Sequence, residues 1–277
     1  MTVDDYLALP RVPAAHRLRY GAAPAQFGDL YLGPDGPRPR PVVIALHDGC
    51  WRERYDLAPL SGLCAALAAE GLAVWSLEYR RLGNGGGWPA TFADVAAGAD
   101  FLRGVADAHS LDLDRVIALG HSAGGHLALW LTGRHHLPDD SLLSPPRGLA
   151  MKGVVSLAGI ADLAQGVREG LCDGACQELV GGSPDEAADR YRQASPLALL
   201  PLGVRHWHIV GSADALVPAE YVGRCAAIAR RHDSVRLEVL PEVGHFELVV
   251  PAPPGWKAVR RAVLDLLNQS ARRRRGR

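Results

Sequence analysis

The sequence predicts an α/β fold with a mainly parallel central sheet that is covered by helices on both faces. Short apolar runs rich in β-branched residues alternate with segments of helical spacing along most of the chain. The 277 residues contain no internal repeat and no linker that would separate domains. We therefore expect a single domain over residues 1–277.

The first half of the chain supplies alternating strands and helices. Residues 57–71 and 91–109 have apolar positions at helical spacing, and the first of these segments ends at Gly71, a suitable C-cap. The glycine-rich "GNGGGWP" at 83–89 predicts a loop, and "DLYLGP" near Asp29 predicts an N-terminal edge strand. The strand candidates are short and apolar, as buried parallel strands are, and they occupy residues 41–47, 72–79 and 115–120.

The second half continues the alternation. A helix is predicted to open at Ser122 and to run to residue 133, and another follows Pro218, which suits a first helical turn. A closing helix is predicted over 254–269. The segment 160–201 is rich in Gly, Asp and Ala, and we expect it to form short helices, a cap-like insertion over the carboxyl edge of the sheet. The remaining strands are predicted at 152–159, 205–212 and 235–241.

Charge and terminal segments argue against nucleic-acid and membrane partners. Thirty basic and 30 acidic residues give a formal net charge of zero, so no overall field attracts a polyanion. The basic tail "ARRRRGR" at 271–277 is predicted to be a solvated end, with a nucleic-acid or membrane tail as the alternative. The N-terminus lacks the apolar segment of a signal peptide, and no apolar run is long enough to span a bilayer.

The five cysteines are odd in number and scattered, which favours free thiols in a reducing cytosol over a disulfide framework. We therefore expect a cytoplasmic location. Cys172 and Cys176 are four residues apart, but no His or Cys partners follow at zinc-site spacing, so no metal site is predicted.

The segment Gly120-His121-Ser122-Ala123-Gly124 predicts a nucleophilic serine. A strand precedes it and a helix follows it, and small residues allow the sharp turn that holds a serine hydroxyl out of the sheet. At the carboxyl edge of a parallel sheet such a serine faces the usual ligand site. The alternative is a serine that only caps the helix.

A serine nucleophile needs a base and an orienting carboxylate. His245 lies in the glycine-bearing loop after the last predicted strand, at the sheet edge where a base is needed. Asp214 follows the preceding strand, and the order Ser122, Asp214, His245 is the one expected for this architecture. Asp162 is the competing acid. The other histidines are set aside by position: His121 and His126 flank the serine too closely, and the rest lie in a strand, polar loops or helix ends.

An oxyanion hole is the remaining requirement for acyl transfer. The amide of Ala123, directly after the nucleophile, supplies one donor. The others are expected from the loop after the first central strand, "LHDGCWRERYD" at 46–56.

With these residues together, the chain resembles the α/β-hydrolases, and within them the branch of arylformamidases (kynurenine formamidases) and related carboxylesterases. That branch carries His-Gly-Gly-x-Trp in this loop, Gly-x-Ser-x-Gly at the turn, and Gly-His before the last helix. The corresponding segments here are His47-Asp48-Gly49-Cys50-Trp51, the Ser122 motif and Gly244-His245, and the likeness covers about residues 40–268. The resemblance implies an α/β-hydrolase fold with a short cap insertion.

Asp48 departs from the pattern, which has glycine at this position. A carboxylate aimed at the oxyanion would repel it, so Asp48 is expected to point away and bond to the loop backbone. The alternative is that it points inward and binds a cationic group of the substrate. The oxyanion donors are then the amides of Gly49, Cys50 and Ala123. Trp51 and Trp88 are expected to wall the substrate pocket, with core packing as the alternative, and His47 is expected to buttress the loop and border that pocket.

These expectations combine into a serine hydrolase that cleaves a small carboxylic ester, or an activated amide such as an aryl formamide, through an acyl-enzyme. No metal or organic cofactor is expected, and the oligomeric state is left open. Three alternatives remain: an acyltransferase or thioesterase with the same triad, a peptidase, and a non-catalytic binding protein. Against a peptidase, 277 residues leave no room for a gating domain. Against a binding protein, all three triad members are present although such a protein would not need them.

Overall fold

The computed structural model describes residues 1–33, 36, 38–143 and 148–275. Within these residues one sheet of eight strands has the order β1-β2-β4-β3-β5-β6-β7-β8. The strands are β1 (His16–Arg19), β2 (Phe27–Leu32), β3 (Arg40–Leu46), β4 (Ala73–Leu77), β5 (Leu111–His121), β6 (Gly153–Leu157), β7 (Arg205–Gly211) and β8 (Val235–Leu240). From β4 to β8 neighbouring strands are parallel, whereas β2 pairs antiparallel with both β1 and β4.

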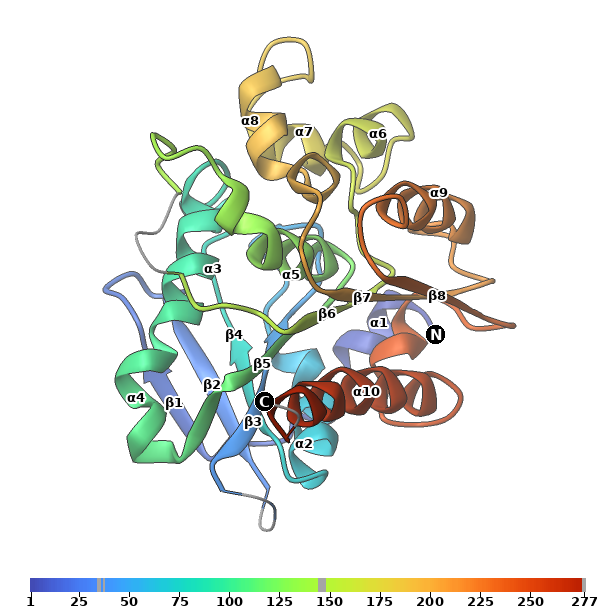
Figure 1. The fold of residues 1–277 in the computed structure, drawn as a ribbon. Helices are drawn as coiled ribbons and strands as arrows, with labels where there is room; N and C mark the ends of the chain where they lie inside the picture. The colour runs from blue at the N-terminus through green and yellow to red at the C-terminus, as the bar shows by residue number, and fades with distance from the viewer. Residues whose placement is uncertain (34–35, 37, 144–147, 276–277) are drawn as a thin grey trace.

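Helices cover both faces of this sheet (Figure 1). Helices α2 and α10 lie on one face, and α3, α5 and α9 lie on the other. The helices are α1 (Val3–Leu7), α2 (Ser61–Ala69), α3 (Ala90–Asp100), α4 (Leu102–His109), α5 (Ala123–Gly133), α6 (Leu163–Arg168), α7 (Ala175–Val180), α8 (Ala188–Ala194), α9 (Ala219–Ala229) and α10 (Gly255–Arg275). Short 3₁₀ turns are η1 (Ala58–Leu60), η2 (Arg134–His136), η3 (Pro196–Leu199) and η4 (Phe246–Val249).

The apolar strand sequences explain why the centre of the sheet is the core. Every residue of β3, β4 and β6 is buried, as expected for parallel strands that have helices on both faces. Helix α5 is buried along its whole length, because it packs against the sheet on one side and against α3 and η3 on the other. The carboxyl ends of the parallel strands meet at one edge of the sheet, where Ser122, Asp214 and His245 follow three different strands.

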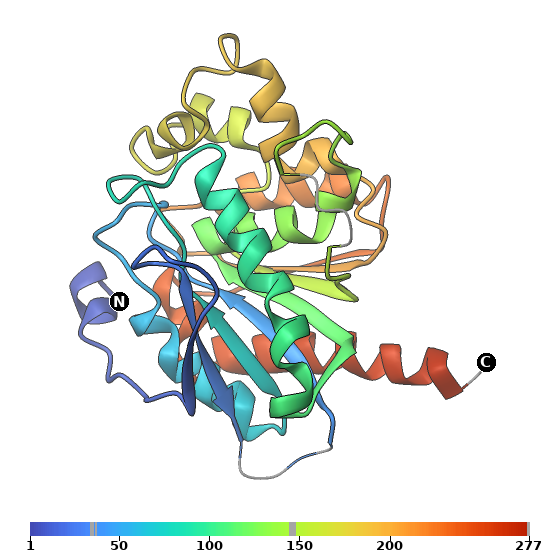
Figure 2. The ribbon, with the colours of Figure 1, turned by 90° about the vertical axis from the view of Figure 1, so that its left-hand side faces the viewer.

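Helices α6, α7 and α8 gather at this edge, at the top of the molecule in Figures 1 and 2. They lie within residues 160–201, the segment expected to be a cap, and we call it the cap segment. Two hydrogen bonds attach its end to α5: His126 Nε2 lies 2.9 Å from the carbonyl oxygen of Ala194, and Trp130 Nε1 donates to the carbonyl of Gln193 at 2.9 Å.

The structure corrects three sequence-based expectations about the elements. The strand near Asp29 is β2, which lies inside the sheet, and the edge is formed by β1, which we did not predict. Helix α1 was also not predicted. The expected helix over 91–109 is divided at Phe101 into α3 and α4. The end of the basic tail, residues 276–277, lies outside the described residues.

Candidate active site

The serine turn has the strained geometry that its glycines make possible. Ser122 has φ 53° and ψ −117°, a region that non-glycine residues rarely adopt. A Cβ at Gly120 would lie 2.0 Å from the carbonyl oxygen of Gly124, and one at Gly124 would lie 2.0 Å from that of Leu46. Both positions therefore need glycine. The amide of Ser122 donates to the carbonyl oxygen of Leu157 at 2.8 Å, which attaches the turn to the neighbouring strand β6.

His245 and Asp214 form a short buried contact. The Nδ1 of His245 lies 2.7 Å from Oδ2 of Asp214. A carboxylate only accepts hydrogen bonds, so Nδ1 carries the hydrogen, and in the neutral ring Nε2 is left as a proton acceptor. The other carboxylate oxygen accepts from the amides of Leu216 at 2.9 Å and Val217 at 2.8 Å, which fixes the orientation of Asp214.

The loops that carry these two residues are joined directly. A Cβ at Gly211, the last residue of β7, would lie 1.9 Å from the carbonyl oxygen of Val243. The amide of Ala213 donates to the same oxygen at 3.0 Å. This close approach brings the Asp214 loop against the segment that leads into His245.

Burial and hydrogen bonding set the charges of the pair. Burial opposes ionisation of Asp214, but the hydrogen bond and charge of His245 and the two backbone amides outweigh it, so the pKa of Asp214 is lowered. Burial and the neighbouring His121 lower the pKa of His245, although Asp214 acts in the opposite direction. The arrangement therefore favours a carboxylate beside a neutral imidazole.

Asp162, the competing acid, has a structural contact instead. Its carboxylate accepts from the amide of Gln165 at 3.0 Å and caps the N-terminus of α6. Asp214 is therefore the carboxylate that the structure places against His245.

The loop after β3 presents backbone amides. Gly49, Cys50 and Trp51 have positive φ values of 104°, 51° and 55°, three consecutive left-handed residues. Within the described residues, the amides of Gly49 and Cys50 donate no hydrogen bond to a protein acceptor. The amide of Ala123 is the first of α5 and so has no partner within the helix. These amides have the properties that an oxyanion hole requires.

The expected pocket residues divide into buried and partly exposed groups. His47 and Trp51 have no exposed surface, so the structure does not support our prediction that they line the substrate pocket. His47 Nδ1 donates to the Asp48 carbonyl at 2.9 Å and its ring stacks on Tyr79, which buttresses the loop as predicted. Trp88 is partly buried, and its ring contacts Phe92.

Asp48 is buried, and among the described residues its carboxylate does not bond to the loop backbone, contrary to our prediction. Its Oδ1 accepts a hydrogen bond from the hydroxyl of Tyr6, a residue of α1, and lies 3.6 Å from Nδ1 of His121. Burial opposes its ionisation, but His121, Tyr6 and His47 outweigh this effect, and the pKa of Asp48 is lowered to about 2. The carboxylate is thus ionised, and its partners are protein groups.

A disulfide between Cys50 and Cys172 contradicts the expectation of free cysteines. The two Cα atoms are 5.5 Å apart, within the usual range for a disulfide. The bond joins the loop after β3 to the cap segment, and Arg52 adds a two-pronged ion pair with Glu178 of α7 at 2.9–3.0 Å. The disulfide also removes the reasoning from which we expected a cytoplasmic location. The other three cysteines, Cys64, Cys176 and Cys225, are free and buried.

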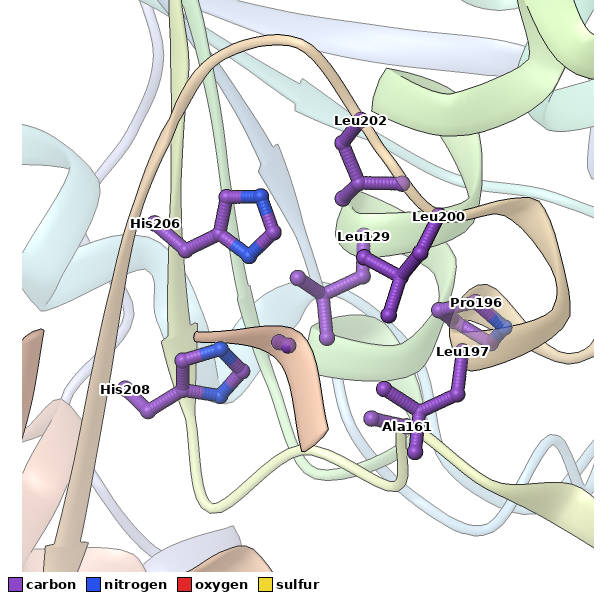
Figure 3. Close-up of a pocket in the computed structure, with 9 residues that line it drawn as sticks. Leu129, Ala161, Pro196, Leu197, Leu200, Leu202, His206 and His208 are labelled. Atoms are coloured by element: carbon purple, nitrogen blue, oxygen red, sulfur yellow. The ribbon is translucent and has the colours of Figure 1, made fainter. Parts of the chain in front are cut away.

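A separate cavity lies beside β7 and is bordered by none of the residues above (Figure 3). Its volume of about 10 Å³ suits no more than one water molecule. It is lined by Leu129, Ala161, Pro196, Leu197, Leu200, Leu202, His206, His208 and Ala229. In the described part of the chain, no group of three or more His, Cys, Asp or Glu residues is arranged to hold a metal ion, and no helix has the length and apolar character needed to cross a bilayer.

Comparison with protein families identifies the chain. A family model described as BD-FAE matches residues 28–223, more than half of the sequence. The chain belongs to the BD-FAE family. BD-FAE proteins are α/β-hydrolases of an esterase family, a coarser assignment than the arylformamidase-like branch, which stays a prediction.

Individual relatives of this BD-FAE chain are also named esterases. Esterase LipC of Mycobacterium tuberculosis is 29% identical over 273 residues, which cover 93% of this chain and 66% of LipC. This BD-FAE chain thus spans slightly less than two thirds of LipC.

Two solved esterases have the same fold as the BD-FAE chain. Esterase B of Lactobacillus rhamnosis superposes with a TM-score of 0.81 at 19% identity, over 99% of this chain and 93% of that one. Est2 of Thermogutta terrifontis, solved with butyrate bound, gives a TM-score of 0.73 at 19% identity over 93% and 94% of the two chains. These likenesses confirm the predicted α/β-hydrolase fold.

Sequence reasoning about the BD-FAE site missed Tyr6 and the disulfide partner Cys172. Tyr6 lies far from every motif in the sequence, and no pattern near it indicates a contact with Asp48. Cys172 carried a usable signal, because Cys50 and Cys172 lie in the two segments already expected to flank the site.

Proposed function

We propose that this BD-FAE protein is a serine hydrolase that cleaves small carboxylic esters with a Ser122-His245-Asp214 triad. The observation that carries the proposal is the 2.7 Å contact between Asp214 and His245, at the same sheet edge as the strained Ser122 turn. The esterase names of the relatives support the same reaction class.

In the proposed reaction, Ser122 Oγ attacks the ester carbonyl and its proton passes to Nε2 of His245. Asp214 stabilises the imidazolium that forms. The negative oxygen of the tetrahedral intermediate rests against the amides of Gly49, Cys50 and Ala123. The imidazolium then gives its proton to the leaving alcohol, and the acyl group remains on Ser122.

A water molecule completes the cycle. His245 takes its proton as the water oxygen attacks the acyl-enzyme, and the second tetrahedral intermediate uses the same amides. Collapse of this intermediate releases the acid and returns the proton from His245 to Ser122. The cycle requires no group beyond those of this chain and water.

The substrate is proposed to have a short acyl group. Ser122 and His245 expose only 3% and 7% of their surfaces, and the tethered cap segment lies over this edge of the sheet, so little room is left for a long chain. Est2, which has the same fold, was solved with butyrate bound. Trp88 is proposed as an aromatic wall, and an aryl formamide is the activated amide that would fit a narrow oxyanion hole.

The experiment compares wild type with Ser122→Ala. A fluorophosphonate probe should label the wild-type serine and leave the variant unlabelled, and turnover of phenyl acetate should fall by about 10³-fold or more. A variant that keeps a tenth of wild-type turnover would show that Ser122 is not the nucleophile.

A substrate panel then assigns the class. We expect the specificity constants for phenyl acetate and phenyl butyrate to exceed that for phenyl laurate. An aryl formamide faster than the acetate would place the protein with the arylformamidases. Faster transfer of the acyl group to an added alcohol or thiol than to water would instead identify an acyltransferase.

A further inference from the structure

A second acid and a second histidine lie directly behind the proposed triad. His121 is fully buried at the end of β5, and Asp48 is 5% exposed in the loop after β3. Their closest polar atoms, Nδ1 of His121 and Oδ1 of Asp48, are 3.6 Å apart. The triad mechanism uses neither side chain, so their burial together needs an explanation.

His121 contacts the catalytic histidine at two points. Its Nε2 lies 3.1 Å from the carbonyl oxygen of His245, which can only accept a hydrogen bond. The centres of the two imidazole rings are 4.4 Å apart with a tilt of 45°. His121 therefore supports both the backbone and the ring of His245.

The two ring nitrogens of His121 both face acceptors. Nε2 faces the His245 carbonyl and Nδ1 faces the Asp48 carboxylate. Nε2 can donate to the carbonyl at 3.1 Å, whereas Nδ1, at 3.6 Å from the carboxylate, makes no hydrogen bond among the described residues. The ionised Asp48 is the acid that lies beside this ring.

Tyr6 completes the arrangement from the N-terminal helix. Its hydroxyl donates to Asp48, and its ring stacks on Phe246, the neighbour of His245, with centres 4.6 Å apart and planes 16° apart. The segment that carries His245 is thus held by His121 on one side and by Tyr6 on another.

We propose that Asp48 and His121 form a second buried acid–histidine pair, which positions the catalytic histidine and balances the charge around it. Both are positioning residues, because they act through His245. The inference rests on the proposed function, since it assigns a role within the same site.

The pair has opposing effects on His245. The charged and titratable groups that act on its ring are Asp214 from the loop after β7, His121 from β5 and Asp48 from the loop after β3. Positive charge on His121 lowers the pKa of His245, and negative charge on Asp48 raises it. Because the two side chains lie 3.6 Å apart, removing one partner should also change the effect of the other on His245.

The decisive experiment is a double-mutant cycle in which kcat/KM is measured as a function of pH. On the acid side kcat/KM falls as His245 becomes protonated, and we call this part of the profile the acid limb. His121→Gln keeps an amide donor near the His245 carbonyl but removes the imidazole whose charge lowers the pKa of His245. The acid limb should therefore move to higher pH by about one unit. Asp48→Asn keeps an acceptor for Tyr6 and removes the anion that raises the pKa of His245, so the acid limb should move to lower pH. Because the two side chains are neighbours, the two shifts should not add in the double variant.

The effect of His121 on the position of His245 is measured separately, from kcat and KM at the pH where the rate is maximal. His121→Leu lacks the donor to the His245 carbonyl and should lower kcat by about tenfold or more with little change in KM. His121→Gln should recover most of this loss.

The control is His206→Gln. His206 is also buried beside a carboxylate, with Nε2 3.4 Å from Asp233 Oδ2, but it lies away from the triad. Its substitution should leave the acid limb in place. Titration of each preparation with a phosphonate gives the concentration of reactive enzyme, to which each rate is normalised. The pH at which the acid limb lies does not depend on how much folded enzyme a variant yields. If His121→Leu fails to fold, the double-mutant cycle of His121→Gln and Asp48→Asn still tests the proposal.

Two results would overturn the pair: an acid limb that does not move in His121→Gln, or shifts that are additive in the double variant. Absence of ester hydrolysis and of phosphonate labelling in the wild type would refute the proposed function instead, so the two failures are distinct.

Discussion

At the scale of single residues, the backbone of Ser122 shows how this site is prepared before substrate binds. Its positive φ places the side chain at the tip of a turn, close to the first amides of α5, which have no partner within the helix. Such a conformation costs on the order of 1–3 kcal/mol. The contacts of Gly120 and Gly124 with backbone oxygens hold the turn in this conformation, so the strain is supported by the packing around it.

The two candidate acids should respond very differently to substitution. Asp214→Asn replaces the acceptor that orients His245, so we expect kcat to fall by about 10³–10⁴-fold. Asp162→Asn affects only a helix cap, so it should leave kcat close to wild type and lower the free energy of unfolding by about 1 kcal/mol or less. Steady-state kinetics and urea unfolding of both variants provide the measurement, and the reverse ranking of kcat would assign the triad to Asp162.

At the scale of elements, the cap segment is tied to the sheet edge through a few specific contacts. The Cys50–Cys172 disulfide and the Arg52–Glu178 ion pair attach it to the proposed oxyanion loop. A third contact is the hydrogen bond from the Trp88 amide to the carbonyl of Leu179 in α7, at 2.7 Å. The position of the cap is therefore linked to that of a loop that carries two of the proposed oxyanion donors.

Loss of the disulfide should lower stability measurably. It closes a sequence separation of 122 residues, and a bond over such a loop contributes about 2–4 kcal/mol. Cys172→Ser should lower Tm by about 5–10 °C and should also lower kcat/KM for phenyl acetate.

The reductant dithiothreitol provides the internal control. It should lower the Tm of the wild type and leave that of Cys172→Ser unchanged, because this variant has lost the bond that the reductant cleaves. Equal Tm values for oxidised wild type and the variant would contradict a stabilising role for this bond.

At the scale of the whole molecule, several histidines are buried in the neutral form. Burial is the largest cause in each case, and it lowers the pKa to about 3 for His47 and His208 and to about 4 for His126 and His206. Figure 3 shows His206 and His208 among apolar side chains around the small cavity. Among the described residues, neither ring nitrogen of His208 has a hydrogen-bond partner.

These histidines make the fold sensitive to acid. Below pH 6.5 the unfolded chain takes up protons at these rings, and the folded chain does not until the pH falls to about 4 or 3. Each ring therefore lowers the free energy of unfolding by about 1.4 kcal/mol per pH unit between these limits.

The urea midpoint should fall steeply from pH 7 to pH 5. His208→Leu should show a shallower fall, because it removes one of these rings from among leucine side chains without the loss of a hydrogen bond. A midpoint that is constant over this range would refute the prediction.

The features predicted from sequence were those that depend on local patterns. Alternating apolar runs were enough for the parallel strands, and chain order together with the strand–turn–helix context pointed to Ser122, Asp214 and His245. Contacts between distant segments carried no such pattern. The burial of Trp51, the pairing of Cys50 with Cys172 and the contact of Tyr6 with Asp48 depend on how loops from different strands meet.

The contact between Tyr6 and Phe246 joins two segments that lie far apart in the sequence, and it has a consequence for synthesis on the ribosome. The chain emerges from its N-terminus, so helix α1 is made long before the surface that receives it. Most of the sheet can form while Tyr6 still has no partner. On the proposed mechanism, a nascent chain that stops short of residue 245 contains the nucleophile but no base, so hydrolytic activity arises only after His245 has been synthesised.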